Sequence, residues 1–337
     1  MNKDLAICLT LLVLAFPALA HHSQAEFDSS QMLDMSGEIV AAYWRNPHVN
    51  FTLKVVDQSG EEQHWEMETS AWNALSRRGL TRDMVESGDL VRVALNVSTK
   101  RQNHARLMNM LLEDGSEVRF AGNSRVWTED VAGLNQVQPS PDPNATNSGS
   151  GLFQVWSIAG GRRVPLDREL PLRDEARAAQ ASWNPLTEDP LLNCIAPGMP
   201  PTMGNPYPMQ FIQQGENIFI HLEEFDNKRL IHMSATTPAS KSHLGHSVGR
   251  WEEGSLLIDT TNINYPYFNR VGVSQSENVT TFERFTLSED EARLDYELTI
   301  TDPSTLTEPV TWRTYYEVRP GEEVKSYECI VERYVPQ

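Results

Sequence analysis

The sequence has few cysteines, a shortage of basic residues and no long hydrophobic run after its first twenty residues. Only 3 of its 337 residues are cysteine, and 28 lysine and arginine residues face 46 aspartate and glutamate residues, which leaves a formal charge of −18. This charge repels phosphate backbones and anionic lipid surfaces, so binding to nucleic acid or to a membrane surface is not expected. Without a later run of about 20 apolar residues, membrane insertion is not expected either.

Several common active-site motifs are also missing. The sequence contains no nucleophile elbow, no Walker loop, no dinucleotide-binding fingerprint and no His-Glu-x-x-His helix. We therefore expect no nucleotide or flavin cofactor. With 39% hydrophobic and 22% charged residues, the composition is that of an ordinary globular protein with a packed core. It carries no indication of oligomeric state.

The first twenty residues have the form of a secretory signal peptide. Lys3 precedes an apolar stretch over 5–16, which is followed by an A-x-A cleavage site at Ala18-Leu19-Ala20. Cleavage after Ala20 predicts an exported protein, periplasmic or secreted.

Export changes how the cysteines are interpreted. Removal of the signal peptide removes Cys8 and leaves Cys194 and Cys329. Two cysteines in an oxidising compartment are expected to form a disulfide, and the alternative is a pair of buried thiols. With either outcome, a cysteine nucleophile or a thiolate metal site is not expected.

Composition divides the chain into a signal peptide, two domains and a linker. We place the signal peptide at 1–20, the first domain at 21–120, the linker at 121–150 and the second domain at 151–337. The linker is assigned because the run over 138–151 is rich in Pro, Ser, Asn and Gly. Such a run lacks the apolar residues that would offset the entropy lost on ordering it.

The predicted fold class is mainly β in both domains. In the first, five short strands with one helix between the third and the fourth are typical of a small OB-like barrel. The strands are expected at 38–44, 49–56, 63–69, 89–97 and 105–112, and the helix at 71–78.

The second domain is expected to have one helix, over 171–182, and roughly nine strands. Period-two alternation is clearest over 292–301, and the last strand is expected at 324–331. Strands at hairpin spacing predict a larger antiparallel up-and-down, lipocalin-like barrel or a curved sheet. Because such barrels often enclose a cavity, we expect this domain to bind a small hydrophobic molecule.

Processing would create the sharpest candidate site. Cleavage makes His21 the first residue, followed by His22, so a free α-amine and two imidazoles lie within one dipeptide. Nitrogen ligands of this kind suit Cu(II), Ni(II) and Zn(II), and one further imidazole would complete a brace suited to copper. The favoured third ligand is His48, which follows Asn46-Pro47 in the break between two strands. The alternatives are a frayed terminus and a partly buried His48.

Two other histidines of the first domain are weaker candidates. His64 lies in the third strand, and the parity of that strand decides whether it points in or out. His104 lies in a polar stretch and is expected to be solvated.

The second domain offers a different group of residues. His246 is a candidate general base, Arg250 a candidate anion clamp and Glu283 a candidate acidic partner. The alternative is structural: Arg250 pairs with a buried carboxylate and His246 caps a turn.

Short motifs in the first domain resemble a family of small secreted bacterial proteins of unknown function. They are His21-His22-Ser23, Gly37-Glu-Ile-Val, Trp44-Arg-Asn-Pro-His48 and Arg78-Gly79-Leu-Thr-Arg-Asp83, within residues 21 to about 115. The resemblance implies an OB-like fold and no established activity. The second domain resembles an uncharacterised exported β domain through Cys194-x-x-Pro-Gly-Met-Pro200, Gly245-His-Ser-Val-Gly-Arg-Trp-Glu252 and Asp302-Pro303.

The leading hypothesis is an exported two-domain β protein that binds a divalent metal ion, copper favoured, and a small hydrophobic ligand in its second domain. The metal would be held by His21, His22 and His48. An alternative is an isomerase or hydrolase that acts on a hydrophobic small molecule in the second barrel, using the residues named for that domain. A third interpretation is a structural envelope protein that uses both barrels for protein contacts.

Overall fold

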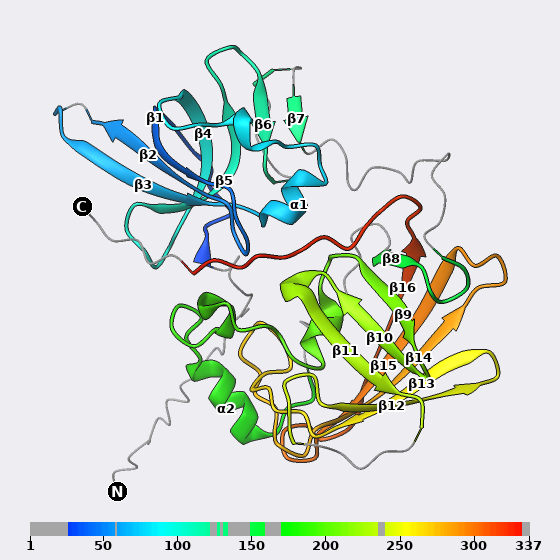
Figure 1. Ribbon diagram of the computed structural model, residues 1–337. Helices are drawn as coiled ribbons and strands as arrows, with labels where there is room; N and C mark the ends of the chain where they lie inside the picture. Colours follow the sequence, from blue (N-terminus) through cyan, green and yellow to red (C-terminus); the bar gives the residue numbers. More distant parts are fainter. Residues whose placement is uncertain are drawn as a thin grey trace, which may run out of the picture.

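A computed structural model describes residues 26–57, 59–121, 127–128, 131–133, 149–158, 170–234 and 240–331. Over these ranges the chain forms two β-barrels, with an extended C-terminal segment lying between them (Figure 1). The predicted signal peptide and most of the predicted linker lie outside the described residues. The mainly β fold class is confirmed.

The first barrel is a ring of five strands. These are β1 (Leu33–Tyr43), β2 (Asn50–Val56), β3 (Glu62–Glu68), β4 (Leu90–Val97) and β5 (His104–Leu111). They pair in the order β3-β2-β1-β4-β5, and a parallel pairing of β3 with β5 closes the ring. Helix α1 (Trp72–Ser76) and the 3-10 turn η2 (Arg82–Met84) connect β3 to β4. The predicted OB-like barrel, with its single helix in this position, is confirmed.

Two short strands extend this sheet beyond β5. They are β6 (Glu117–Arg119) and β7 (Val131–Gly133), which pair in parallel. The backbone N–H of Trp127 donates a 2.7 Å hydrogen bond to the buried carboxylate of Glu117. Part of the range assigned to the linker therefore belongs to the first domain, while 134–148 lies outside the described residues.

The second barrel has nine strands. These are β8 (Val155–Ile158), β9 (Met209–Gln214), β10 (Asn217–Leu222), β11 (Asn227–His232), β12 (His246–Glu252), β13 (Ser255–Thr261), β14 (Thr280–Leu287), β15 (Arg293–Thr301) and β16 (Val310–Val318). Neighbouring strands are antiparallel except for β11 and β12, which are parallel. A ring with an odd number of strands cannot close through antiparallel pairs alone, so one parallel pair is required. The predicted larger barrel is confirmed, with this one departure from up-and-down pairing.

The described part of the second domain contains four helical segments: α2 (Asp174–Ser182), η4 (Pro190–Asn193), η5 (Pro201–Gly204) and η6 (Glu224–Asp226). Helix α2, expected from the sequence, begins with two acidic residues, which suit the positive end of the helix dipole. Its Ala176 packs against the core of the second barrel. None of the described helices is long and apolar enough to cross a membrane.

Large side chains occupy the interior of the second barrel. Trp156, Phe211, Phe285 and Tyr296 are each less than 3% exposed. Among them, the carboxylate of Glu283 pairs with a guanidinium from β11 and accepts a 2.7 Å hydrogen bond from the hydroxyl of Tyr296. The interior is therefore packed, with one buried ion pair at its centre.

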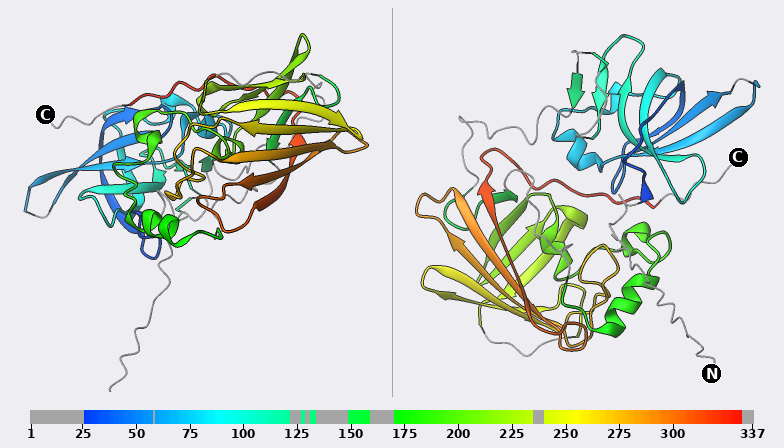
Figure 2. Two further views of the ribbon diagram at one scale, coloured as in Figure 1. Left: turned by 90° about the horizontal axis from the view of Figure 1, so that it is seen from below. Right: turned by 180° about the vertical axis from the view of Figure 1, so that it is seen from behind.

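The chain after β16, residues 319–331, leaves the second barrel and runs along the first (Figures 1 and 2). We call it the C-terminal strap. The strand predicted at 324–331 is wrong, because the strap forms only an isolated bridge, between Cys329 and Asn46. The N–H of Ile330 donates to the carbonyl of Asn46 at 3.0 Å, and Tyr327 packs edge-on against Tyr207. These contacts with both domains hold the strap outside the second barrel.

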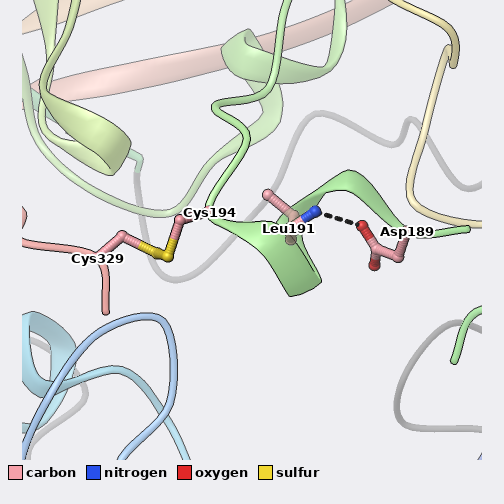
Figure 3. The surroundings of a disulfide bond; sticks show 4 residues. All are labelled: Asp189, Leu191, Cys194 and Cys329. Carbon is pink, nitrogen blue, oxygen red and sulfur yellow. Dashed lines mark hydrogen bonds between the residues drawn. A yellow bond between two sulfur atoms is a disulfide. The ribbon is translucent and has the colours of Figure 1, made fainter. Parts of the chain in front are cut away.

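The predicted disulfide between Cys194 and Cys329 is confirmed (Figure 3). It joins the strap to the second-domain loop that contains η4, where the carboxylate of Asp189 accepts a 3.0 Å hydrogen bond from the N–H of Leu191. The disulfide thus attaches the strap to the second domain, while a backbone hydrogen bond joins it to the first.

A buried ion pair joins the two domains directly. The guanidinium of Arg77, after α1, donates two hydrogen bonds to the fully buried carboxylate of Glu223. That carboxylate also accepts from the side-chain amide of Asn73 at 2.9 Å and from the backbone N–H of Lys325 at 2.8 Å. Arg77 donates in addition to Glu322 of the strap, at 2.8 Å.

We predict that Glu223→Ala lowers the free energy of unfolding by about 3–5 kcal/mol, because it leaves a buried guanidinium without its carboxylate. Urea denaturation at neutral pH measures the change. Asp34→Ala removes the partner of Arg92 in an exposed pair and is the control, for which little change is expected. Equal losses in the two variants would contradict the prediction.

Replacement of both Cys194 and Cys329 by serine should lower the free energy of unfolding by up to about 4 kcal/mol, because the unfolded chain regains the entropy of an open loop. Denaturation with and without reductant provides the measurement. Reductant should cause the same loss in the wild-type protein and none in the double variant, and an effect of reductant on the double variant would refute the interpretation.

Candidate functional site

A cavity of about 730 Å³ lies between the two domains. One wall is made by the end of β1, the loop 44–49, β2 and β3 of the first barrel. The other is made by the loop 185–194 of the second domain and the end of the C-terminal strap. Its size falls within the range of small-molecule sites, which often occur between domains.

Closure of the first barrel builds the charged part of this cavity. In the parallel pairing of β3 with β5, Glu66 lies opposite His104. Because alternate residues of a strand point to the same side, Glu68 lies beside His104 as well. The imidazole Nε2 is 3.2 Å from a carboxylate oxygen of Glu68, and Nδ1 is 3.5 Å from one of Glu66.

Arg101 connects this cluster to the beginning of the described chain. Its guanidinium donates to the carboxylate of Glu26 at 2.6 and 2.8 Å and lies 3.4 Å from a carboxylate oxygen of Glu68. The hydroxyl of Ser98 also donates to Glu26. Glu26 is only 5% exposed and lines the cavity, so the described chain starts within the cavity wall.

The neighbouring charges favour the ionised forms of both members of the Glu68–His104 pair. Burial by itself would raise the pKa of Glu68, but the hydrogen bond from His104 and the nearby positive charges lower it to about 2. Burial would likewise lower the pKa of His104, but its bonds to Glu66 and Glu68 raise it above its ordinary value of 6.5. Near neutral pH Glu68 is therefore a carboxylate, and its charge favours the protonated form of His104.

His48 lies in the loop between β1 and β2 and is exposed at the cavity. Its Nδ1 is 2.9 Å from the carbonyl oxygen of Thr69, and since a carbonyl only accepts, Nδ1 carries the hydrogen. In the neutral imidazole Nε2 then has the lone pair that a metal ligand needs. His48 lies near Glu68, because its ring is bonded to the carbonyl of Thr69, the next residue along the chain.

His64 lies on β3 opposite Lys54 and is exposed at the far end of the same wall. It is four residues from Glu68 along the strand, a separation of about 13 Å. His64 and the cluster around Glu68 therefore do not share one metal ion.

The wall from the second domain combines apolar groups with one ion pair. Its apolar groups lie before η4 and within it. They are Pro185, Leu186, Leu191 and Leu192. Arg270 reaches the cavity and donates a 2.5 Å hydrogen bond to the buried Glu224. The positive charge of this arginine is thus neutralised from within its own domain.

The structure does not bring together the three residues proposed for catalysis in the second barrel. Arg250 is 51% exposed on the outside of the barrel and pairs with the exposed Asp259, not with a buried carboxylate. His246, four residues earlier on β12, stacks on His232 with ring centroids 4.8 Å apart. Glu283 points into the interior, so it lies on the opposite side of the sheet.

One expectation about the first domain is wrong, and several site residues were not anticipated. His104 is not solvated but 4% exposed, because β3 pairs with β5 over it. The sequence analysis did not single out Glu26, Glu66, Glu68 or Arg101. The alternation of His64, Glu66 and Glu68 along β3 is a signal that they share a side, but their proximity to His104 depends on a pairing between distant segments.

Within the described ranges, no group of three or more His, Cys, Asp or Glu side chains is arranged to hold a metal ion. His21 and His22, two of the three predicted metal ligands, lie outside the described residues. A metal ion at His48 would therefore need ligands from residues upstream of Glu26 or from solvent.

Comparison with known proteins adds a family match for the first domain. Residues 9–107 match the model of a family of unknown function (DUF6152). This range reaches from the predicted signal peptide into β5, in agreement with the resemblance to an uncharacterised family noted above. No curated protein matches the chain.

We predict that Glu68→Gln destabilises the protein and lowers the pKa of His104. The folded-state pKa of Glu68 is lowered from 4.5 to about 2, so its contribution to stability is present above pH 4.5 and is lost as the pH falls toward 2. The contribution of His104, whose pKa is raised, is present below pH 6.5 and is lost as the pH rises through its folded-state value.

Urea denaturation across this pH range and NMR titration of the His104 ring provide the measurements. The stability difference between wild type and Glu68→Gln should shrink between pH 4.5 and 2. Glu62→Gln, on the same strand, is the control, with no effect expected on His104. An unchanged His104 pKa in Glu68→Gln would rule out the pair.

Proposed function

We propose that the protein is exported and binds a divalent metal ion, most favourably copper, through its mature N-terminus and His48. The observation that carries the proposal is the position of Glu26, the first described residue, in the wall of the cavity that His48 lines. Five residues of chain, 21–25, precede it after cleavage following Ala20.

The length of this segment supports the proposal. Five residues span at most about 17 Å when extended. Glu26 is bonded to Arg101, which reaches Glu68, and Glu68 lies close to His48. Glu26 and His48 both line the cavity, and the proposal requires residues 21–25 to span the gap between them.

The chemistry of the donors also supports it. An N-terminal histidine offers an amine and an imidazole nitrogen, and His48 offers Nε2 because its Nδ1 is bonded to the backbone. The hydrogen bond at Nδ1 orients the ring, as is common for histidine ligands. Three nitrogen ligands favour copper among the divalent metals. A bound copper ion would supply a Lewis-acidic or redox-active centre at one end of the cavity.

The proposed export has separate support. The Cys194–Cys329 disulfide is typical of proteins that fold in an oxidising compartment. The A-x-A site at Ala18-Leu19-Ala20 would place the signal peptidase cut directly before His21.

The other parts of the leading hypothesis remain predictions. A small hydrophobic ligand in the second barrel would have to share an interior that Trp156, Phe211 and Phe285 occupy. The alternative enzyme lacks a specific observation in its favour, because Arg250 and Glu283 lie on opposite sides of the sheet.

Copper titration of correctly processed protein tests the metal site. We expect one Cu(II) per chain, and we expect one extra residue before His21 to weaken the affinity by more than about tenfold, as should His48→Ala. His64→Ala is the matched control, since this histidine is exposed on the same wall but distant from the proposed site. Isothermal titration calorimetry and the electron paramagnetic resonance signal of Cu(II) give affinity and nitrogen ligation.

Unchanged tight binding in the extended protein would exclude the terminal amine as a ligand. Equal losses in His48→Ala and His64→Ala would exclude a specific role for His48.

A further inference from the structure

A strip of neutral and acidic side chains on β2 and β3 faces the cavity. In register, Asn50 lies opposite Glu68 and Thr52 opposite Glu66, and His64 continues the row along β3. All five line the cavity. Because successive residues of a strand rise by about 3.3 Å, the row from Glu68 to His64 is about 13 Å long. The strip therefore suits an extended polar ligand better than a single ion.

The opposite wall of the cavity is largely apolar, apart from Asp189 and the Arg270–Glu224 ion pair. It is formed by Pro185, Leu186, Leu191 and Leu192 of the second domain and by Ile330 and Val331 of the strap. Four of the ten large hydrophobic residues that are exposed in the described chain line this cavity: Tyr43, Leu192, Ile330 and Val331. Exposed apolar groups that gather around one cavity are a sign of a binding surface.

Three of the charged groups at the cavity are already paired with groups of opposite charge. Glu26 is paired with Arg101, Glu68 with His104, and Arg270 with a carboxylate of its own domain. An ionic ligand would have to compete with these partners. A carboxylate in an ion pair still has lone pairs that accept hydrogen bonds from hydroxyl groups. The cavity thus favours a neutral ligand that is rich in hydroxyl groups.

We infer that this cavity binds a neutral saccharide, with its hydroxyl groups on the strip of β2 and β3 and an apolar ring face or substituent against the wall of the second domain. The hydroxyl groups of a sugar would form hydrogen bonds with the polar side chains of the strip, and the apolar C–H faces of its rings would contact the leucines. A free oligosaccharide and the sugar of a glycolipid share this chemistry. The inference goes beyond the proposed metal binding and requires no metal ion.

Calorimetric titration of the metal-free mature protein tests the inference. The probes are cellotriose, n-octyl-β-D-glucoside below its critical micelle concentration, and octyl sulfate, which has the same tail on a charged head. We expect saturable binding of cellotriose or octyl glucoside and none of octyl sulfate. Binding of cellotriose alone would identify a free oligosaccharide as the ligand, and binding of octyl glucoside alone would identify a sugar linked to an apolar chain.

Matched variants locate the site. Glu66→Gln should weaken binding by about tenfold, because the amide keeps one acceptor oxygen but loses the charge that strengthens a hydrogen bond to it. Glu62→Gln, on the same strand outside the cavity, should have no effect. Leu192→Ala should weaken binding, whereas Leu33→Ala, an exposed leucine of the first barrel outside the cavity, should not.

Three results would overturn the inference. They are the absence of binding of both sugars at millimolar concentration, binding of octyl sulfate as strong as that of octyl glucoside, and unchanged affinity in both Glu66→Gln and Leu192→Ala. Because the titrations use protein treated with a chelator, a failure of the copper experiment leaves this test unaffected.

Discussion

Arg77 of the first domain and Glu223 of the second form an ion pair that is buried between the barrels. A buried charge is stable only with a well-placed partner, so this pair favours the relative position of the two domains that brings its members together. The C-terminal strap takes part in the same junction, because the backbone N–H of Lys325 donates to Glu223 and Glu322 accepts from Arg77. Two distant parts of the chain, the region of α1 and the strap, therefore converge on a single carboxylate. This junction therefore contributes to the spacing between the two walls of the cavity.

The cavity shows how an acidic protein can keep several charges in a confined space. Each acidic group of the first wall is matched locally: Glu26 by Arg101, and Glu66 and Glu68 by His104. Such internal pairing leaves little net field for an ionic ligand and preserves hydrogen-bonding capacity for a neutral one. The low pKa of Glu68 follows from the same pairing.

The parts of the structure that local sequence patterns determine were predictable. Period-two alternation identified strands such as β15, and the break at Asn46-Pro47 placed the loop that carries His48. An even number of cysteines after processing was enough to predict the disulfide.

Features that depend on contacts between distant segments could not be predicted in this way. The parallel pairing of β3 with β5, which buries His104, has no local signature. The strap contains residues that are common in strands, such as Tyr327 and Ile330. Its contacts with distant residues, among them Asn46 and Glu223, hold it outside the barrel. For the same reason Glu223 could not be recognised as a junction residue, because its partner Arg77 belongs to another domain.

The cavity takes its walls from Glu26, the first described residue, and from Val331, the last. Neither barrel alone encloses it, and neither does the pair of barrels without the strap. During synthesis or export, which proceed from the N-terminus, the two barrels have all their strands before the strap emerges. The cavity is therefore the last part of the molecule to be completed, and a chain arrested before Ile330 would lack the two residues that the strap contributes to its wall.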